Sequence, residues 1–363
     1  MNVLFITCDQ WRADSLSCSG HPVVRTPSLD RLASEGMRFA RHYTQSAPCG
    51  PARASLYTGQ YLMNTRAVTN GSPVSRSHPN VATELRKLGY DAVLTGYNDI
   101  GADPLGADLS DPALHSYGGP MPGISSIDAN PGGSSSHLAS NHTAWLASLG
   151  YEIPSELLPS DKGPAATATF ASAEIPSSVK GGQANVILPG PFSVGVDDDG
   201  QPVSAFYSAD HTEGGYCVSR AQEHIASKHG SPWAICLSSL RPHPPWLLPE
   251  PFNRQYPPSQ CGGPHKHRMP SPAEEAALHP YMAQRLTWEM LTVPEGTTDE
   301  ELALMKSQYW GSCSEADYQL GRLFDWLRER GEWDNTLGAL VALRRTHPLS
   351  THTPSPNLAT RQT

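Results

Sequence analysis

Stretches with the pattern of buried strands alternate with stretches with the pattern of helices in the N-terminal part of the chain, and this alternation limits the possible folds more than any other feature. The predicted elements are a strand over residues 2–7, a helix over 27–36, a strand over 37–43, helices beginning near Cys49 and over 81–89, and a strand over 90–95. Successive parallel strands need a crossover between them, usually a helix. The order therefore predicts an α/β fold with a largely parallel central sheet flanked by helices.

The pattern weakens in the middle of the chain and returns towards its C-terminus. Residues 96–210 are rich in Gly, Pro, Ser and Asp, which predicts a loop-rich insertion with one short helix over 143–149. The later predicted elements are a helix over 213–228, a strand over 233–239, a helix from Thr298 with a break near Gly311, and a strand over 336–343. Residues 344–363 lack an apolar period and have the composition of a disordered tail. We therefore expect a single domain over 1–343.

The charge and cysteine content exclude several classes of partner and compartment. The chain carries 26 basic and 35 acidic residues, a net charge of −9, without a long basic run, which disfavours nucleic acid or an anionic membrane as a partner. Seven cysteines, with no Cys-x-x-Cys pair, do not form the pattern of a disulfide framework. The apolar start is too short for a signal peptide, and no stretch approaches a membrane span. These features predict a cytoplasmic protein.

One thiol lies just ahead of a proline-started helical turn, in the segment Cys49-Gly50-Pro51-Ala52-Arg53. Proline suits the first turn of a helix because its missing N–H would be unpaired there anyway. The free amides and the dipole at that end favour an anion, and an arginine follows within one turn. A lone cysteine is more often a buried, inert thiol. In this setting Cys49 is instead a candidate nucleophile for a small anionic substrate.

Further polar residues follow the predicted strands. Asp9 and Gln10 come directly after the first strand, Asn70 lies in a loop after the proline-started helix, and His243 follows the strand over 233–239. Because the carboxyl ends of parallel strands meet at one edge of a sheet, we expect these residues to lie near one another. Each has an ordinary alternative: a helix cap for Asp9, a turn for Asn70 and a proline-rich loop for His243.

The chemistry of these residues suits ester hydrolysis. A carboxylate and an amide beside a nucleophile, as in Asp9 and Gln10, suit a divalent cation that polarises ester oxygens. The planar guanidinium of Arg53 can hold an oxyanion. His243 can donate to the anion or protonate a leaving oxygen.

The segment Cys-x-Pro-x-Arg followed by Leu-x-Thr-Gly, over residues 49–59, resembles the signature of the sulfatases in the alkaline-phosphatase-like superfamily. Within that superfamily the chain is most similar to phosphonate monoester hydrolases and related arylsulfatases. The similar segments are DQWRAD over 9–14, PCGPARAS over 48–55, YLMN over 61–64, RAV over 66–68 and RPHPP over 241–245. The resemblance implies an alkaline-phosphatase-like fold.

The resemblance also implies roles for single residues. Cys49 would be oxidised by a formylglycine-generating enzyme to formylglycine, which serves as nucleophile and metal ligand. The implied metal ligands are Asp9, Gln10 and Cys49; the implied catalytic residues are Cys49, Arg53 and His243; the implied substrate-binding residues are Gln10, Asn70 and Tyr97. The implied cation is calcium, with manganese and magnesium as alternatives. A homo-oligomer is a further expectation from the family.

Three functions follow as expectations. The first is hydrolysis of sulfate esters, and the second is hydrolysis of phosphonate monoesters or phosphodiesters. The third is a catalytically impaired remnant that binds metal weakly. In the family an Asp-His-Gly or Asp-Asn-Gly follows the next metal-binding strand, whereas here Arg344-Arg345-Thr346 follows and no acidic residue occurs after Asp334. The predicted fold therefore lacks its C-terminal part. Asp99 stands where the resemblance predicts a hydroxyl residue, and its carboxylate is expected to repel a dianionic ester.

Overall fold

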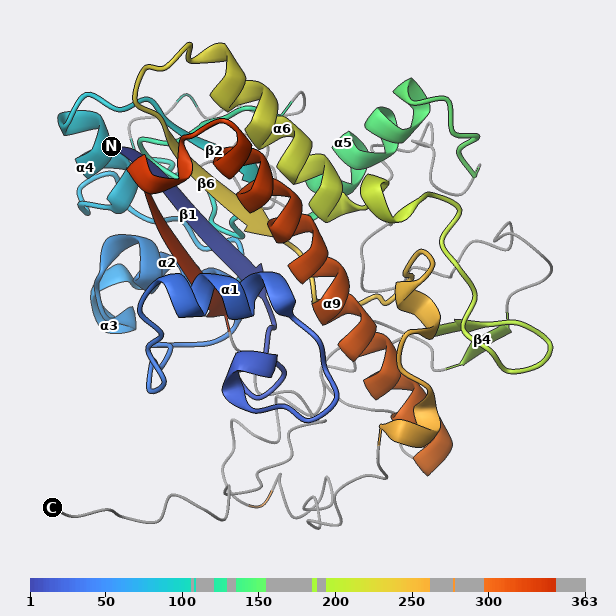
Figure 1. The fold of residues 1–363 in the computed structure, drawn as a ribbon. Helices are drawn as coiled ribbons and strands as arrows, with labels where there is room; N and C mark the ends of the chain where they lie inside the picture. Colours follow the sequence, from blue (N-terminus) through green and yellow to red (C-terminus); the bar gives the residue numbers. More distant parts are fainter. Residues whose placement is uncertain are drawn as a thin grey trace, which may run out of the picture.

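A sheet of five parallel strands forms the centre of the molecule (Figure 1). The computed structural model describes residues 1–105, 108, 121–128, 135–154, 185–187, 194–261, 277 and 297–343. The strand order is β3-β2-β6-β1-β7, and every pairing in this sheet is parallel. The strands are β1 Asn2–Asp9, β2 Ala92–Gly96, β3 Ser125–Ser126, β6 Ala234–Ser239 and β7 Thr336–Leu343.

Both faces of the sheet are covered, which explains why its inner strands are buried along almost their whole length. Every residue of β2 and β6 is buried, as expected for parallel strands between two layers of helices. Successive side chains alternate between the faces: Ile235 and Leu237 enter one hydrophobic cluster, and Cys236 enters the other.

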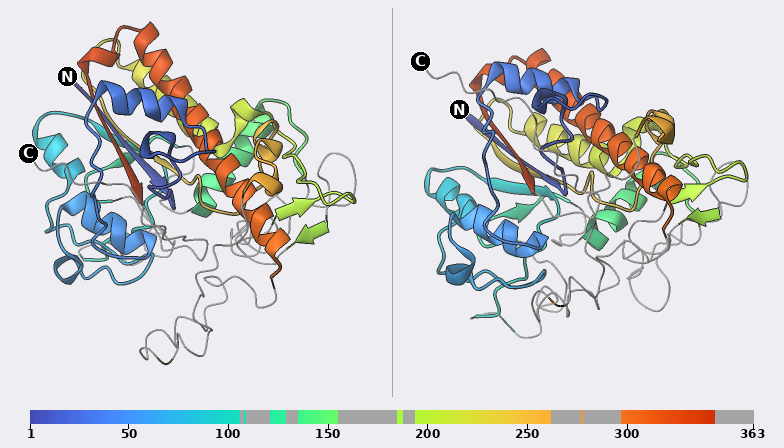
Figure 2. Two further views of the ribbon diagram at one scale, coloured as in Figure 1. Left: turned by 60° about the horizontal axis from the view of Figure 1, so that its bottom comes forward. Right: turned by 90° about the horizontal axis from the view of Figure 1, so that it is seen from below.

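Helices form a layer on each side of this sheet (Figure 2). One layer contains α1 Pro27–Glu35, α6 Glu213–Ser227 and α9 Asp299–Glu329. The other contains α2 Cys49–Thr58 and α4 Val81–Lys87. The remaining elements are α3 Leu62–Thr65, α5 Ser135–Ser148, the antiparallel pair β4 Asn185–Ile187 and β5 Val194–Val196, and short 3-10 turns at Ser17–Ser19, Ala209–His211, Phe252–Arg254, Pro258–Gln260 and Trp333–Asn335.

Most of the predicted elements are confirmed, and three local predictions are wrong. Residues 37–43 form no strand, because Met37 and Phe39 project into solvent and no neighbouring strand pairs with them. The helix α9 runs without a break through Gly311, where the missing side chain permits close approach: a Cβ would lie 2.3 Å from the carbonyl oxygen of Phe252. The helix predicted over 143–149 starts earlier, since α5 spans Ser135–Ser148. The predicted tail over 344–363 lies outside the described residues.

Gly96 is required where β2 ends, and we expect its replacement by alanine to destabilise the fold. Its φ of +95° is left-handed, and a Cβ there would lie 2.0 Å from the carbonyl oxygen of Ser238 on β6. The conformation alone costs about 1–2 kcal/mol for an L-residue, and the clash adds to that cost. Gly20→Ala is the matched control, because Gly20 has a φ of +89° but no atom lies within 4 Å of the point where its Cβ would be. Urea unfolding should show a larger loss of unfolding free energy for Gly96→Ala than for Gly20→Ala. Equal losses in the two variants would contradict the clash.

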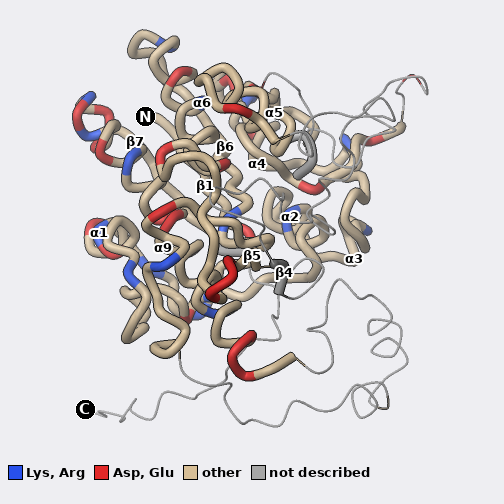
Figure 3. The backbone as a smooth tube through the Cα atoms, turned by 90° about the vertical axis from the view of Figure 1, so that its right-hand side faces the viewer, with Lys and Arg blue, Asp and Glu red and all other residues tan. Residues whose placement is uncertain are grey.

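Charged residues of both signs are distributed along the described chain (Figure 3). Figure 3 shows Lys and Arg interspersed with Asp and Glu along the tube. The strand β7 forms one edge of the sheet, where Leu337 is 54% exposed. Among the described helices, none combines the length and the apolar character needed to cross a membrane.

Candidate active site

The carboxyl ends of the central strands converge on the start of α2. Asp9 is the last residue of β1, Asp99 follows β2 by three residues, and Cys49 is the first residue of α2. Strand ends at this edge of an α/β sheet are the usual place for a ligand. The sequence therefore delivers chemical groups from three separate segments to one position.

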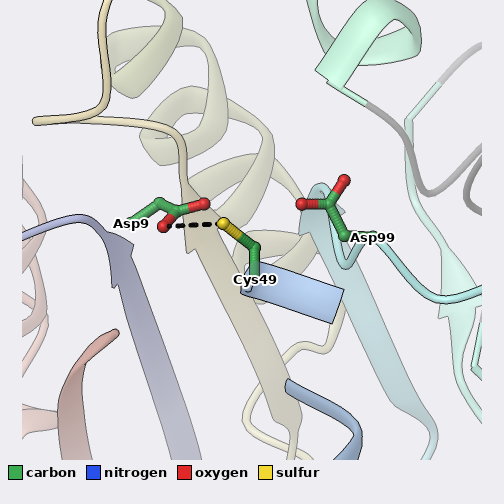
Figure 4. A group of neighbouring side chains, drawn as sticks. All are labelled: Asp9, Cys49 and Asp99. Carbon is green, nitrogen blue, oxygen red and sulfur yellow. Dashed lines mark hydrogen bonds between the residues drawn. The ribbon is translucent and has the colours of Figure 1, made fainter. Parts of the chain in front are cut away.

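Cys49 lies between two carboxylates (Figure 4). Its Sγ donates to Oδ1 of Asp9 at 3.4 Å. The possible ligand atoms of Asp9, Cys49 and Asp99 all lie within 4.8 Å of one another, and all three residues are buried. This compact group of side chains, Asp9, Cys49 and Asp99, is called the donor cluster below.

Arg53 lies one turn into α2 and is completely buried beside the donor cluster. Its Nη1 donates to the carbonyl oxygen of Tyr97 at 3.1 Å and to Oγ of Ser238 at 2.6 Å. The guanidinium lies over the Tyr97 ring, with its Cζ 4.3 Å from the ring centroid. Its Nη2 lies 3.7 Å from Oδ2 of Asp9 and has no hydrogen-bond partner within the described part of the chain. This nitrogen is therefore available to an anion at the donor cluster.

The charges around Asp9 keep it ionised. Burial by itself raises the pKa of Asp9, but the charges of Arg53 and His243 and the hydrogen bonds from Tyr97 and Cys49 outweigh it, so that the pKa lies below its ordinary value. Burial, with Asp9 nearby, raises the pKa of Tyr97 well above its ordinary value. The Tyr97 hydroxyl therefore remains protonated and donates to Oδ2 of Asp9.

Cys49 itself is a neutral thiol in this environment. Burial, followed by the charges of Asp9 and Asp99, raises its pKa well above its ordinary value. Because the thiolate is the reactive form of cysteine, the unmodified side chain is a poor nucleophile at neutral pH. The position at a helix start is favourable for an anion, but the thiol does not supply the reactive group.

The other sequence-predicted residues are Asn70, Gln10 and His243. The Oδ1 of Asn70 accepts from the backbone N–H of Gly50 at 2.8 Å and so fixes the first turn of α2. Gln10 is buried with a left-handed φ of +59°, and its Oε1 has no hydrogen-bond partner among the described residues. His243 is half-buried after β6, and its ring faces the carbonyl oxygen of Pro244. Its influence on Asp9 is through its charge.

Sequence reasoning assigned no site role to Ser238 and interpreted Asp99 only as a repelling charge. Ser238 accepts from Arg53, and it is the fifth residue of β6, close to the strand end. Asp99 belongs to the donor cluster. Ser238 is a polar residue near the end of the predicted strand over 233–239, which was an available signal, whereas Asp99 lies four residues beyond the predicted strand over 90–95 and had no such signal.

The donor cluster fits a hard divalent cation. Carboxylate and amide oxygens are the ligands that Ca²⁺, Mg²⁺ and Mn²⁺ prefer. Two buried carboxylates lie together here, and the residue after Asp9 is Gln10, whose amide oxygen has no hydrogen-bond partner within the described part of the chain. The sulfur of Cys49 is a softer donor, and an oxygen in its place would match the two carboxylates better.

Comparison with known proteins decides the family, since the sulfatase family model matches residues 1–140 and 205–341. The chain belongs to the sulfatase family. It is 34% identical, over 93% of its length, to the multifunctional alkaline phosphatase superfamily protein PehA of Trinickia caryophylli. It is similar to the crystal structure of the phosphonate monoester hydrolase of Agrobacterium radiobacter, with a TM-score of 0.73 and 35% identity over 94% of the chain. It is also 32% identical to an ulvan-active sulfatase of Formosa agariphila, over 27% of the chain.

This sulfatase-family chain spans a similar fraction of PehA and of the Agrobacterium phosphonate monoester hydrolase. It covers 61% of PehA and 62% of the Agrobacterium enzyme. The α/β fold with a parallel central sheet is thus the alkaline-phosphatase-like fold expected from the sequence. Members of this family generally use a divalent metal and a formylglycine.

Proposed function

We propose that this sulfatase-family chain is an ester hydrolase whose preferred substrates are phosphonate monoesters and phosphodiesters, with sulfate monoesters as secondary substrates. This substrate preference rests on how much of the chain is similar to a phosphonate monoester hydrolase and how much is similar to a sulfatase. Similarity to a phosphonate monoester hydrolase extends over 94% of the chain at 35% identity, whereas similarity to the ulvan-active sulfatase covers 27%. The choice reverses the order in which the sequence alone placed the two substrate classes.

Cys49 supplies the nucleophile in this proposal after oxidation to formylglycine by a formylglycine-generating enzyme. The hydrated aldehyde offers two hydroxyls on one carbon, one to attack the ester and one to release the product as the aldehyde re-forms. The raised pKa of the thiol supports this role, because the unmodified side chain is a poor nucleophile. An oxygen at position 49 also matches the hardness of the neighbouring carboxylates.

Asp9, Gln10 and residue 49 would hold a divalent cation, which we propose is calcium. A bound cation would polarise the ester oxygens and offset the charge of the substrate. The buried carboxylate of Asp9 and the Oε1 of Gln10, which has no hydrogen-bond partner among the described residues, support their assignment as ligands. The low pKa of Asp9 keeps its carboxylate in the ionised form that a cation needs.

The remaining residues orient the substrate and move one proton. The Nη2 of Arg53 lies 3.7 Å from Oδ2 of Asp9, has no hydrogen-bond partner in the described part of the chain, and can donate to a non-bridging ester oxygen. Tyr97 holds Asp9 in place through its hydroxyl and also stacks against Arg53. Asn70 fixes the helix start that carries residue 49. His243, on the loop after β6, is the group proposed to protonate the leaving oxygen.

Kinetics on paired substrates test the proposal. The chain is produced in a host that makes formylglycine and assayed with p-nitrophenyl phenylphosphonate, bis-p-nitrophenyl phosphate and p-nitrophenyl sulfate, which share one leaving group. We expect kcat/KM for the first two to exceed that for the sulfate by at least ~10-fold, a difference of about 1.4 kcal/mol in transition-state stabilisation. Turnover of the sulfate alone would contradict the proposed preference.

A further inference from the structure

We propose that Asp99 is itself a ligand of the divalent cation, so that β1 and β2 each deliver one carboxylate to the metal. This inference deepens the proposed function and rests on it. From the sequence, Asp99 was expected only to repel a dianionic ester; here its carboxylate binds the cation. Three observations support ligation by Asp99: the geometry of the donor cluster, the buried guanidinium beside it, and the charges at the site.

The distances permit one ion to contact both carboxylates. Oxygen ligands lie about 2.3–2.6 Å from Ca²⁺, so two ligands of one ion can be at most about 5.2 Å apart. The ligand atoms of Asp9, Cys49 and Asp99 meet this condition, because all lie within 4.8 Å of one another. Figure 4 shows the two carboxylates on either side of the Cys49 sulfur.

The loop after β2 holds Asp99 in this position. Asp99 is buried and has a left-handed φ of +52°, which is uncommon for a residue with a side chain. Its carbonyl oxygen accepts from the backbone N–H of Gly71 at 3.0 Å. Strained backbone of this kind persists where the surrounding structure imposes it. Here it directs the carboxylate towards residue 49.

The electrostatics favour a cation in the same place. Two carboxylates brought together away from water repel each other and lose hydration, and a divalent ion relieves both costs. An independent observation comes from Arg53, whose buried Nη2 lies 3.7 Å from Asp9 without a hydrogen-bond partner in the described ranges. This nitrogen is ion-paired with Asp9 and can still donate a hydrogen bond to an anionic ligand beside the carboxylates. An anionic ester bridging the cation and Arg53 satisfies both requirements.

Asp99 also affects which esters fit. The carboxylate of Asp99 adds one negative charge beside Asp9, in a site where the cation, Arg53 and His243 supply the positive charge. Phosphonate monoesters and phosphodiesters carry a single negative charge, whereas a phosphate monoester carries close to two at neutral pH. The charge of Asp99 therefore disfavours a doubly charged ester more than a singly charged one.

Metal binding by the full chain tests the inference without relying on activity. Titration with Mn²⁺, followed by electron paramagnetic resonance and calorimetry, compares the unsubstituted chain with Asp99→Asn and Asp9→Asn. We expect both variants to bind at least ~10-fold more weakly, since even outer-shell partners of metal ligands cost about 10–100-fold when removed. Asp103→Asn is the matched control: Asp103 is buried on the same loop, but its carboxylate accepts from the backbone N–H groups of Arg76 and Leu105.

The outcomes separate this inference from the proposed function. Unchanged Mn²⁺ affinity in Asp99→Asn, with a loss in Asp9→Asn, overturns the role of Asp99 and leaves the metal site intact. Failure of the unsubstituted chain to bind Mn²⁺ overturns the metal site itself. Asp99→Glu keeps the charge and should retain more affinity than Asp99→Asn; equal losses would contradict ligation. In the assay, Asp99→Asn should raise the turnover of p-nitrophenyl phosphate relative to the diester.

Discussion

Replacing Cys49 by alanine is expected to lower kcat/KM by at least ~10⁴-fold on every ester that the chain hydrolyses, the order of loss seen when a catalytic nucleophile is removed. Alanine leaves neither a thiol nor any group that could become formylglycine. The fold should tolerate the change, because a thiol is a weak hydrogen-bond donor and its bond to Asp9 therefore contributes little. The melting temperature measured in EDTA should therefore change little.

Mass spectrometry of the active-site peptide connects this loss to the modification. Peptides from a competent host should contain the aldehyde or its hydrate at position 49 instead of a thiol. Cys18→Ala is the matched control, since Cys18 is a half-buried thiol in the turn at Ser17–Ser19, and it should keep full activity. An active Cys49→Ala variant, or full activity with an alkylatable thiol at position 49, would refute the assigned nucleophile.

Much of the fold could be predicted from the sequence because its signals are local. The burial of β1 follows from an apolar run, and the predicted start of α9 at Thr298 follows from Thr298 and Glu301, which form a capping box. Pro27 and the residue before it marked the start of α1 in the same way. The carboxyl ends of parallel strands then had to meet, which placed Asp9 near the start of α2.

What could not be predicted depends on contacts between distant segments. The apolar residues over 37–43 fit a strand in isolation, but the sheet offers them no neighbouring strand. Gly311 has the character of a helix breaker in the sequence, yet the backbone of Phe252 packs against it and needs the space that it leaves. The place of Asp99 depends on the loop after β2 and the left-handed backbone there. None of these contacts leaves a signal in the adjacent sequence.

The role of Arg53 was predicted from the sequence, but its burial is seen only in the structure. Its replacement is expected to destabilise the fold and to slow the reaction. The family signature predicted its role as an anion ligand, whereas the structure shows it completely buried between Asp9, Tyr97 and Ser238. Removing one partner of a buried ion pair typically costs about 3–5 kcal/mol, because the other charge is left without compensation. We expect a loss of about this size in the free energy of unfolding for Arg53→Met, which keeps most of the side-chain volume.

A double-mutant cycle with Asp9→Asn, measured by urea unfolding in EDTA, separates the charge from the packing. Once Asp9 is neutral, the loss of the guanidinium no longer leaves an unpaired carboxylate. The double variant should therefore be more stable than the two single losses predict, by about 0.5–3 kcal/mol, the usual range for residues in contact. Arg53→Lys should fall between the unsubstituted chain and Arg53→Met in stability, since an ammonium keeps the charge but lacks the second nitrogen that faces Asp9 and the planar group that lies over the Tyr97 ring. Additive losses would show that Arg53 stabilises the fold through packing and the Ser238 contact, and that its charge is not coupled to Asp9.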